Sequence, residues 1–379
     1  MTFKSNKKKF LIRDASINDC EAVSVLLIEL GLKMPSVQLE RNLHWKQMWI
    51  DNPAIKNTDE KFVPGKVLEF NKQIVGFFGS VPLLYYLGKK QISMSTAIHW
   101  GIKKEARSET NKLANAYFNE INSDVALVTT SNKAASRLFK GYGYIPVPQP
   151  DYDTTLYWIT NATGFLSAYF RKKSFPKVLS IVLGSMIGKI VNCTLPFLRR
   201  FPKVSPSDID IINISEVDTT FDELWSSKLK EPEKLLACRS SEALRWHFKS
   251  KSLSNRCKIL TYVNKRLKGY IIILREDSPD IGLKRLRIVD VFIENDDDLI
   301  LKKLLTSSYW LAKKSGCHSL EIIGLPTALR KKIKVHCPFE RKMPSWPLFY
   351  KPGSKLMAEK LKNELVWYIT AYDGDSSLL

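Results

Sequence analysis

The chain has 379 residues, a length typical of about two domains, and its 44% hydrophobic and 26% charged residues are ordinary globular proportions that exclude a disordered or collagen-like chain. The balance of 59 Lys and Arg against 38 Asp and Glu leaves a formal net charge of +21. A surplus of this size indicates an acidic partner, which can be a nucleic acid, an anionic lipid or a phosphorylated ligand.

The first 150 residues are predicted to form alternating strands and helices. Ser16 and Asp19 are suited to cap a helix whose apolar residues recur at helical spacing. Three consecutive strand segments follow, and the turns between them, Asn71-Lys72 and Gly88-Lys89, suit antiparallel hairpins. The predicted strands are 10–13, 66–70, 74–86, 91–102, 125–129 and 144–147, and the predicted helices are 18–31, 108–120 and 133–140.

Residues 151–206 form an apolar, basic and proline-punctuated connector that carries +6 of the net charge. Its apolar stretches 178–188 and 190–198 are separated by Lys189 and flanked by basic clusters. No uninterrupted apolar run reaches about 18 residues, so we expect no clear transmembrane helix. Two interpretations stay open: an interfacial helix on an anionic bilayer, and a buried linker helix between two domains.

From residue 207 the chain alternates again, and its order of elements is similar to that of the first half. The sequence therefore predicts an α/β fold with mixed, mostly antiparallel sheets flanked by helices, in two domains at 1–150 and 207–379 that the connector joins. In the second half the predicted strands are 209–214, 258–263, 268–275, 286–292 and 319–323, and the predicted helices are 220–227, 241–248 and 298–315.

Six scattered cysteines contain no CxxC pair. This pattern favours a reducing cytosol, and we expect neither a metal site nor a disulfide framework. The N-terminus has three lysines at 7–9 but no apolar stretch behind them, so a secretory signal is not predicted. We expect a cytoplasmic protein, peripheral to the inner membrane if the connector binds lipid.

Four stretches of the first half have a distinctive pattern and order: IRDA (12–15), WGI (100–102), RSETNKL (107–113) and NKAASRLFKGYGY (132–144). They resemble the first strand, central sheet, acyl-CoA pyrophosphate loop and C-terminal signature of the GCN5-related N-acetyltransferase (GNAT) superfamily. The last stretch is the most specific of the four. The resemblance implies a GNAT-like domain over residues 1–150 that binds an acyl-CoA.

The resemblance also implies which residues contact the acyl-CoA. A strand-to-helix turn presents backbone N–H groups and a positive helix terminus, which suits a pyrophosphate. Thr110 and Lys112 stand where the family has glycines, so a loop that binds nothing is the alternative, and Arg107 and Lys112 are the charges that would compensate. The implied contacts are Trp100, Gly101, Ile102, Arg107, Ser108, Thr110, Asn111, Lys112 and Asn132.

Candidate acid and base residues follow from the same resemblance. Phe139 stands where many family members have a tyrosine that protonates the leaving thiolate, so Tyr142 or Tyr144 would have to take that role. His99 lies on the predicted central strand, has an ordinary pKa suited to accepting a proton from an amine, and is the first candidate base. Glu69 is the second. Alternatively, each of these residues has a structural role. A strong base is then dispensable, because holding the thioester and the amine together supplies most of the catalysis.

The second half has a resemblance of its own, carried by RSSEALRWHF (239–248). It is similar to the Arg…Leu-x-Trp-Arg-Tyr segment of tandem-GNAT proteins encoded with bacterial polysaccharide genes. Residues 268–270, 288–291, 367–370 and 373–375 fit other parts of such proteins. The acidic run 294–298 would repel phosphates, so we expect this half to face the acceptor and not to bind CoA. Trp246 is then an acceptor contact or a core residue, and His247 replaces the family's arginine.

The predicted function is therefore acyl-CoA-dependent N-acyl transfer to an amino sugar or related amine of a cell-surface polysaccharide. One alternative is a FemAB-like transferase that uses aminoacyl-tRNA. Another is a non-catalytic scaffold at the membrane surface. Nucleic acid other than tRNA is disfavoured, because no nucleic-acid-binding motif is present. The predicted partners are a small-molecule or glycan acceptor and an anionic membrane surface contacted through 171–200.

Overall fold

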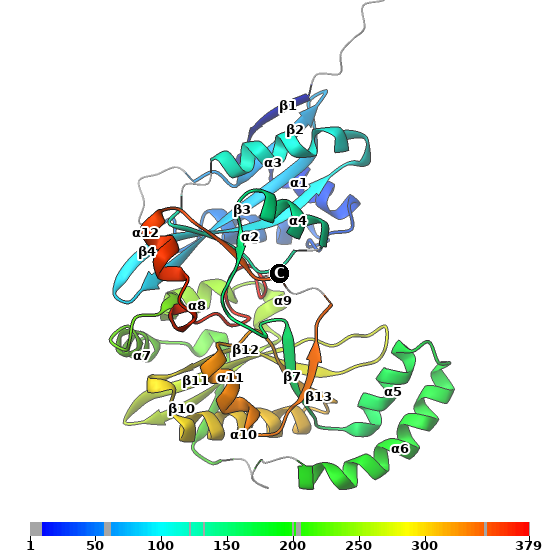
Figure 1. Cartoon of the computed structure of the whole chain (residues 1–379). Coiled ribbons are helices and arrows are strands. Elements are labelled where there is room, and N and C mark those ends of the chain that lie inside the picture. Colours follow the sequence, from blue (N-terminus) through cyan, green and yellow to red (C-terminus); the bar gives the residue numbers. More distant parts are fainter. Residues whose placement is uncertain are drawn as a thin grey trace, which may run out of the picture.

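The computed structural model describes residues 10–56, 62–120, 123–131, 133–198, 201, 206–344 and 347–378. Two mixed β-sheets stack one above the other, and the C-terminal segment ends between them (Figure 1). The predicted α/β class with helix-flanked mixed sheets is confirmed.

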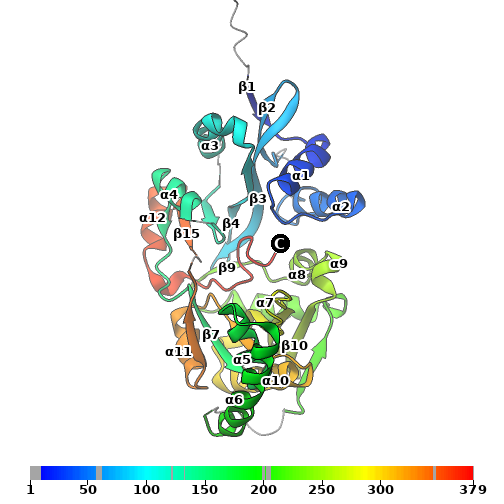
Figure 2. The ribbon, with the colours of Figure 1, turned by 90° about the vertical axis from the view of Figure 1, so that its right-hand side faces the viewer.

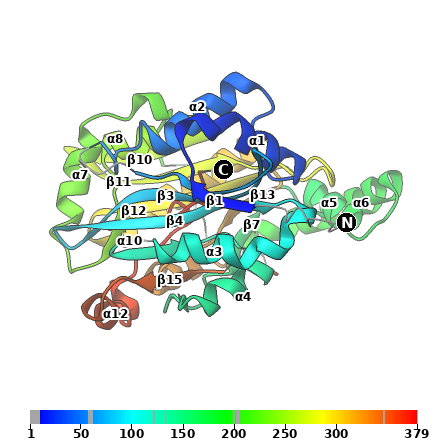
Figure 3. The same ribbon diagram turned by 90° about the horizontal axis from the view of Figure 1, so that it is seen from above.

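The first sheet is built mainly from the first half of the chain. Helices α1 (Cys20–Glu29) and α2 (Gln38–Trp49) cover one of its faces, and α3 (Thr110–Asn119) and α4 (Lys133–Gly141) cover the other (Figures 2 and 3). A short strand, β9 (Leu235–Ala237), pairs with β3. The strand order is β1 (Phe10–Asp14), β2 (Gly65–Phe70), β3 (Gln73–Leu87), β4 (Lys90–Ile102), β5 (Val125–Val128), β15 (Phe349–Pro352) and β6 (Ile145–Pro146).

The second sheet repeats this plan. Helix α10 (Asp298–Lys314) joins β12 to the parallel strand β13, as α3 joins β4 to the parallel strand β5. The smaller helices of this half are α7 (Thr220–Lys228), α8 (Ser241–His247), α9 (Lys251–Ser254) and α11 (Thr327–Lys334). The strand order is β14 (Phe339–Lys342), β7 (Thr154–Ile159), β13 (Ser319–Ile322), β12 (Arg285–Ile293), β11 (Arg266–Arg275), β10 (Cys257–Asn264) and β8 (Ile209–Ile212).

The two halves exchange their last strands. Strand β7 leaves the first half and lies between β13 and β14, whereas β15 leaves the second half and lies between β5 and β6. Each sheet therefore needs a strand from the other half to complete its backbone hydrogen bonds. Strand β7 lies within the predicted connector, so this segment does more than link two domains. The boundaries at 150 and 206 stay a prediction.

A helical hairpin projects from the second sheet. It consists of α5 (Ala162–Lys172), a turn and α6 (Lys177–Leu198), and we call it the hairpin (Figures 1 and 3). Helix α6 is long and apolar enough to cross a membrane, by length and composition only, whereas the sequence predicts no clear transmembrane helix because Lys189 interrupts its apolar run. The interpretation as a buried linker helix is wrong, because Val178 and Ile190 are 74% and 70% exposed.

Candidate functional site

The two central strands of the first sheet separate after a short parallel pairing. Strands β4 and β5 are in register only from Met94 and Val125 to Thr96 and Leu127. Beyond this point a cleft of about 330 Å³ opens between them. Its lining comes from the loop after α1, strands β3, β4 and β5, the loop after β5, helix α4 and the C-terminal segment: Leu32, Lys33, Phe78, Ala97, Ile98, His99, Trp100, Val128, Thr130, Ser131, Ala135, Phe139 and Asp375.

A β-bulge in β4 forms one wall of this cleft. Gly79 of β3 pairs with Ile98 and Phe77 pairs with Gly101, so His99 and Trp100 together oppose the single residue Phe78. The bulge places His99 in the left-handed region with φ of 52°, which is uncommon for a residue with a side chain. A bulge leaves its extra residue out of the regular ladder. Backbone polar groups at 99–100 are therefore oriented differently from those of an ordinary strand.

His99, the first predicted base, contacts a second histidine. Its Nε2 lies 3.4 Å from Nε2 of His44 on α2. Burial lowers the pKa of His44 to about 4, and burial with the neighbouring His44 lowers the pKa of His99 to about 3. Both rings are neutral at pH 7, so one of them donates this hydrogen bond and the other accepts it. His99 lines the cleft, but with this pKa it is a weak base.

Asp375 brings a carboxylate into the cleft from the far end of the sequence. Its Oδ1 accepts a hydrogen bond of 2.5 Å from Thr129 Oγ1, and its Oδ2 accepts one from Thr130 Oγ1. Burial raises the pKa of Asp375 to about 6, against the effect of the two hydroxyls. Gly374 has φ of 68°, and a Cβ there would lie 2.5 Å from the Thr129 side chain. The glycine therefore allows the tail to approach β5.

The sequence did not identify Asp375 as a site residue. The sequence of 373–375 indicates only the end of the second half, and nothing local shows that this end returns to the first sheet. A buried carboxylate with a pKa near neutrality is nevertheless the kind of group that serves as a general base.

Aromatic rings form a large part of the cleft wall. Trp100 stacks on Phe78 with ring centroids 4.7 Å apart, and Phe78 also stacks on Tyr117 of α3. Phe139 of α4 lines the cleft but is only 3% exposed, and it has no proton to donate. Tyr142, the predicted substitute acid, stacks on Phe118 and donates a hydrogen bond to Asn115 Oδ1. It does not line the cleft.

The remaining predicted catalytic residue, Glu69, is also away from the cleft. It lies on β2, where Oε1 forms an ion pair of 2.6 Å with Arg13 Nη2. Arg13 bridges Glu69 to Asp19 at the start of α1, with Nη2 to Oδ1 at 2.8 Å. The structure therefore brings together His99 and Trp100 in the cleft, and it leaves Glu69 and Tyr142 in packing and ion-pair contacts elsewhere.

The predicted pyrophosphate loop forms a 3-10 helix, Lys104–Glu109, that continues into α3. The N–H of Ala106 bonds to Lys103 O and that of Thr110 to Arg107 O, so two donors of the turn are used within it. Arg107, Ser108 and Asn111 are exposed, and Lys112 pairs with Glu109 at 2.7 Å. None of the predicted loop residues lines the described cleft, and Lys33 is the cation at its edge.

Two other residues that were predicted to contact the cofactor have roles in packing. A Cβ at Gly101 would lie 2.6 Å from Leu30 Cδ1, so this glycine lets α1 pack closely on β4. Ile102 packs in the aromatic core under α3. Asn132 lies outside the described residues.

The equivalent place in the second sheet is filled by protein. Strand β12 has its own irregularity beside Val289, and it pairs with β13 only as far as Ile288 and Ile322. Just beyond, Asp290 is bound by the guanidinium of Arg239, and both side chains are fully buried.

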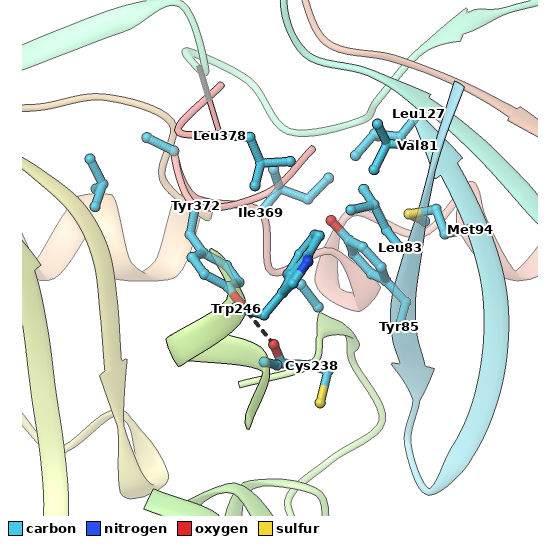
Figure 4. Close-up of a cluster of buried hydrophobic side chains, with 14 of the residues drawn as sticks. Val81, Leu83, Tyr85, Met94, Leu127, Cys238, Trp246, Ile369, Tyr372 and Leu378 are labelled. Carbon is cyan, nitrogen blue, oxygen red and sulfur yellow. Dashed lines mark hydrogen bonds between the residues drawn. The ribbon is translucent and has the colours of Figure 1, made fainter. Parts of the chain in front are cut away.

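Trp246 lies between the two halves in a packed environment (Figure 4), and the adjacent His247 is also buried. Trp246 Nε1 donates to Gln47 O at 2.7 Å, and His247 Nε2 is 2.7 Å from Ser377 Oγ. Nearby Tyr372 donates to Cys238 O at 3.0 Å. The cavity that these residues border has a volume of about 30 Å³, close to that of one water molecule. Trp246 is therefore a core residue here. Within the described residues, no group of three His, Cys, Asp or Glu is placed to hold a metal.

Comparison with solved structures identifies proteins of similar fold. A GCN5-related N-acetyltransferase from Anabaena variabilis has a TM-score of 0.57 and 12% identity over 92% of this chain and 74% of its own. A probable N-acyltransferase of unknown function from Enterococcus faecalis has a TM-score of 0.59 and 9% identity over 91% and 73%. A GCN5-related N-acetyltransferase from Kribbella flavida has a TM-score of 0.55 and 8% identity over 91% of this chain and 71% of its own.

Sequence comparisons give no such match: no protein-family model and no curated protein matches the chain. Because the identities of the solved structures are so low, the likeness concerns the arrangement of the backbone. The chain shares the fold of these solved structures over more than nine tenths of its length.

Proposed function

We propose that the protein is an acyl-CoA-dependent N-acyltransferase whose acyl donor lies in the cleft between β4 and β5. The observation that carries this proposal is the separation of two parallel strands beside a bulge. Past Thr96, no described strand pairs with the β5-facing edge of β4. An extended arm with amide groups, such as the pantetheine of CoA, can bond to such an edge as an added strand does.

The residues around the cleft suit acyl transfer to an amine. The amine nitrogen attacks the thioester carbonyl carbon, the C–N bond forms, the C–S bond breaks and the CoA thiolate leaves. Backbone N–H groups at the bulge of His99 and Trp100 stabilise the oxyanion. The carboxylate of Asp375 accepts the proton of the attacking amine, because its pKa of about 6 makes it mostly ionised at pH 7 yet basic enough to act.

The acceptor that we propose is an amino sugar or related amine of a cell-surface polysaccharide. Its support is the resemblance of residues 239–248 to tandem-GNAT proteins of polysaccharide gene clusters. In the protein this segment contacts the same C-terminal tail that carries Asp375, since Arg239 pairs with Asp373 at 3.2 Å. A single tail thus connects the second half to the cleft.

Calorimetric titration with acetyl-CoA tests the proposal. We expect binding to the wild type, and strongly reduced binding to Ala97→Trp, which fills the cleft. Ala358→Trp, a half-buried alanine on α12 (Lys355–Leu361) and not among the cleft-lining residues, is the matched control and should bind as the wild type does. No binding of acetyl-CoA at millimolar concentration would refute the proposal. Binding of aminoacyl-tRNA at low salt in its place would favour the FemAB-like donor.

A further inference from the structure

The hairpin exposes an apolar face. In an ordinary surface helix the large apolar side chains face the core. In α6 the buried positions are Ser180, Gly184, Gly188 and Leu195, a narrow and mostly small-residue stripe. Eight large apolar side chains of the turn and α6 lie outside this stripe and are exposed: Phe175, Val178, Leu179, Ile181, Val182, Met186, Ile187 and Ile190.

The small-residue stripe holds α6 against α5. A Cβ at Gly184 would lie 2.1 Å from Ser167 Oγ, and one at Gly188 would lie 2.4 Å from Thr163 Cα. Asn192 Oδ1 accepts a hydrogen bond of 2.8 Å from the N–H of Ala162, which ties the far end of α6 to the start of α5. The two helices therefore form one unit, and the opposite side of α6 remains available for a partner.

The charged residues of the hairpin itself are all basic. No Asp or Glu lies between residues 154 and 207. Arg171, Lys172 and Lys173 stand at the tip of the hairpin, Lys177 starts α6, and Lys189 lies within it. A cationic rim around an apolar face is complementary to anionic lipid. A second copy of the chain would instead bring like charges together.

We propose that the hairpin lies in the interface of a bilayer containing anionic phospholipid, with the exposed face of α6 at the boundary between headgroups and acyl chains. Helix α5 has 11 residues, about 17 Å of helix against a hydrocarbon core of about 30 Å. It cannot span a bilayer while it stays packed on α6, so the hairpin enters from one side. The inference does not depend on the proposed acyl transfer.

Vesicle sedimentation with the full chain tests this inference. We expect binding to phosphatidylcholine vesicles that contain phosphatidylglycerol, and little binding to phosphatidylcholine alone. Lys172→Gln/Lys173→Gln should weaken binding about 30-fold, since each basic residue near the surface contributes about fivefold. Val178→Glu/Met186→Glu should weaken it at least tenfold. The matched controls are Lys89→Gln/Lys90→Gln, in an exposed β-turn, and Leu356→Glu/Leu365→Glu, whose leucines are as exposed as Val178.

A cysteine label reports the depth of the same face. Cys193 is exposed one turn beyond Ile190, and Cys337 is exposed elsewhere. A polarity-sensitive fluorophore on Cys193 of the Cys337→Ser variant should shift to the blue with anionic vesicles, and the same label on Cys337 of Cys193→Ser should not.

Four results would overturn the inference. The first is that the protein does not sediment with anionic vesicles at low salt, and the second is that the hairpin and control variants lose vesicle binding equally. The third is an oligomer that forms without lipid and that Val178→Glu/Met186→Glu dissociates. The fourth is that only detergent extracts the protein from the vesicles. The third result would assign the face to a second copy, and the fourth to a membrane-spanning helix.

Discussion

Arg239 and Asp290 form a fully buried, bidentate ion pair. Arg239 Nε lies 2.9 Å from Asp290 Oδ2, and Nη2 lies 3.0 Å from Oδ1. The same Nη2 reaches Asp373 in the C-terminal tail at 3.2 Å, and Tyr85 of β3 donates to Asp373 at 2.7 Å. The ion pair therefore stands where the second sheet, the tail and the first sheet meet, and it fixes the segment that carries Asp375.

Removing Arg239 should destabilise the whole protein. Arg239→Met leaves the carboxylates of Asp290 and Asp373 buried without a cation, and breaking a buried pair in this way costs about 3–5 kcal/mol. Denaturant unfolding measures the loss. Arg275→Met, which removes an exposed pair with Asp277, should cost less than about 1 kcal/mol. Adding Asp290→Asn to Arg239→Met should recover part of the stability, and a further loss would contradict this account.

The buried tail shows what the sequence can and cannot predict. Strands such as β2 to β4 and the helix α10 are predicted correctly, because their apolar periodicity and turn residues are local. Strands β7 and β15 were missed, because their partners lie in the opposite half of the chain and no local pattern encodes an exchange. Asp375 cannot be predicted for the same reason, and no local pattern predicts the bulge at His99 and Trp100 that interrupts the alternation of β4.

Asp375 should make the stability depend on pH. Its pKa is raised to about 6 in the folded protein, above the usual value of about 3.9, so the folded state binds its proton more tightly. The resulting stabilisation is complete below about pH 3.9 and is lost as the pH rises through 6. It amounts to something on the order of 3 kcal/mol. Asp375→Asn should therefore be more stable than the wild type at pH 8, and the difference should shrink towards pH 4 in urea unfolding.

The same substitution separates catalysis from folding. If Asp375 accepts the amine proton, Asp375→Asn lowers kcat by about 100-fold or more and removes the acidic limb of the kcat profile, while acetyl-CoA still binds. Thr129→Val removes one hydroxyl that orients the carboxylate and should shift that limb to higher pH. If kcat is unchanged in Asp375→Asn, the C-terminal tail has only a structural role.

Buried histidines should change the stability with pH in the direction opposite to that of Asp375. Burial, with the nearby charge of Arg239, lowers the pKa of His247 to about 3, below the ordinary 6.5 or so. The unfolded state then takes up the proton first, so stability falls as the pH falls from about 6.5 towards 3. His247→Gln should flatten this decline by up to about 1.4 kcal/mol per pH unit. Urea unfolding at successive pH values measures it, and an unchanged slope would show that the imidazole titrates normally.

The packing of the hairpin depends on Gly188. Gly188→Ala places a methyl group against Thr163, and overpacking of this kind costs about 1–3 kcal/mol. Helix α5 should then loosen, which hydrogen exchange of the amides at 162–172 detects. Gly141→Ala is the control, because a Cβ at the end of α4 meets nothing within 4 Å. Equal protection of α5 in both variants would mean that the hairpin adapts without loosening.

Substitutions at His99 separate the contribution of the bulge from that of the imidazole to acyl transfer. Its φ of 52° is tolerated by asparagine and strained for a β-branched residue by about 1–3 kcal/mol. His99→Asn should fold normally and keep acyl transfer within about threefold of the wild type, because a ring with a pKa near 3 contributes little as a base. His99→Val should lower the unfolding free energy and weaken acetyl-CoA binding, since it distorts the backbone that we propose to hold the thioester oxygen. If His99→Asn instead loses more than about 100-fold in kcat with acetyl-CoA binding intact, the proton of the amine goes to His99, and Asp375 only orients the tail.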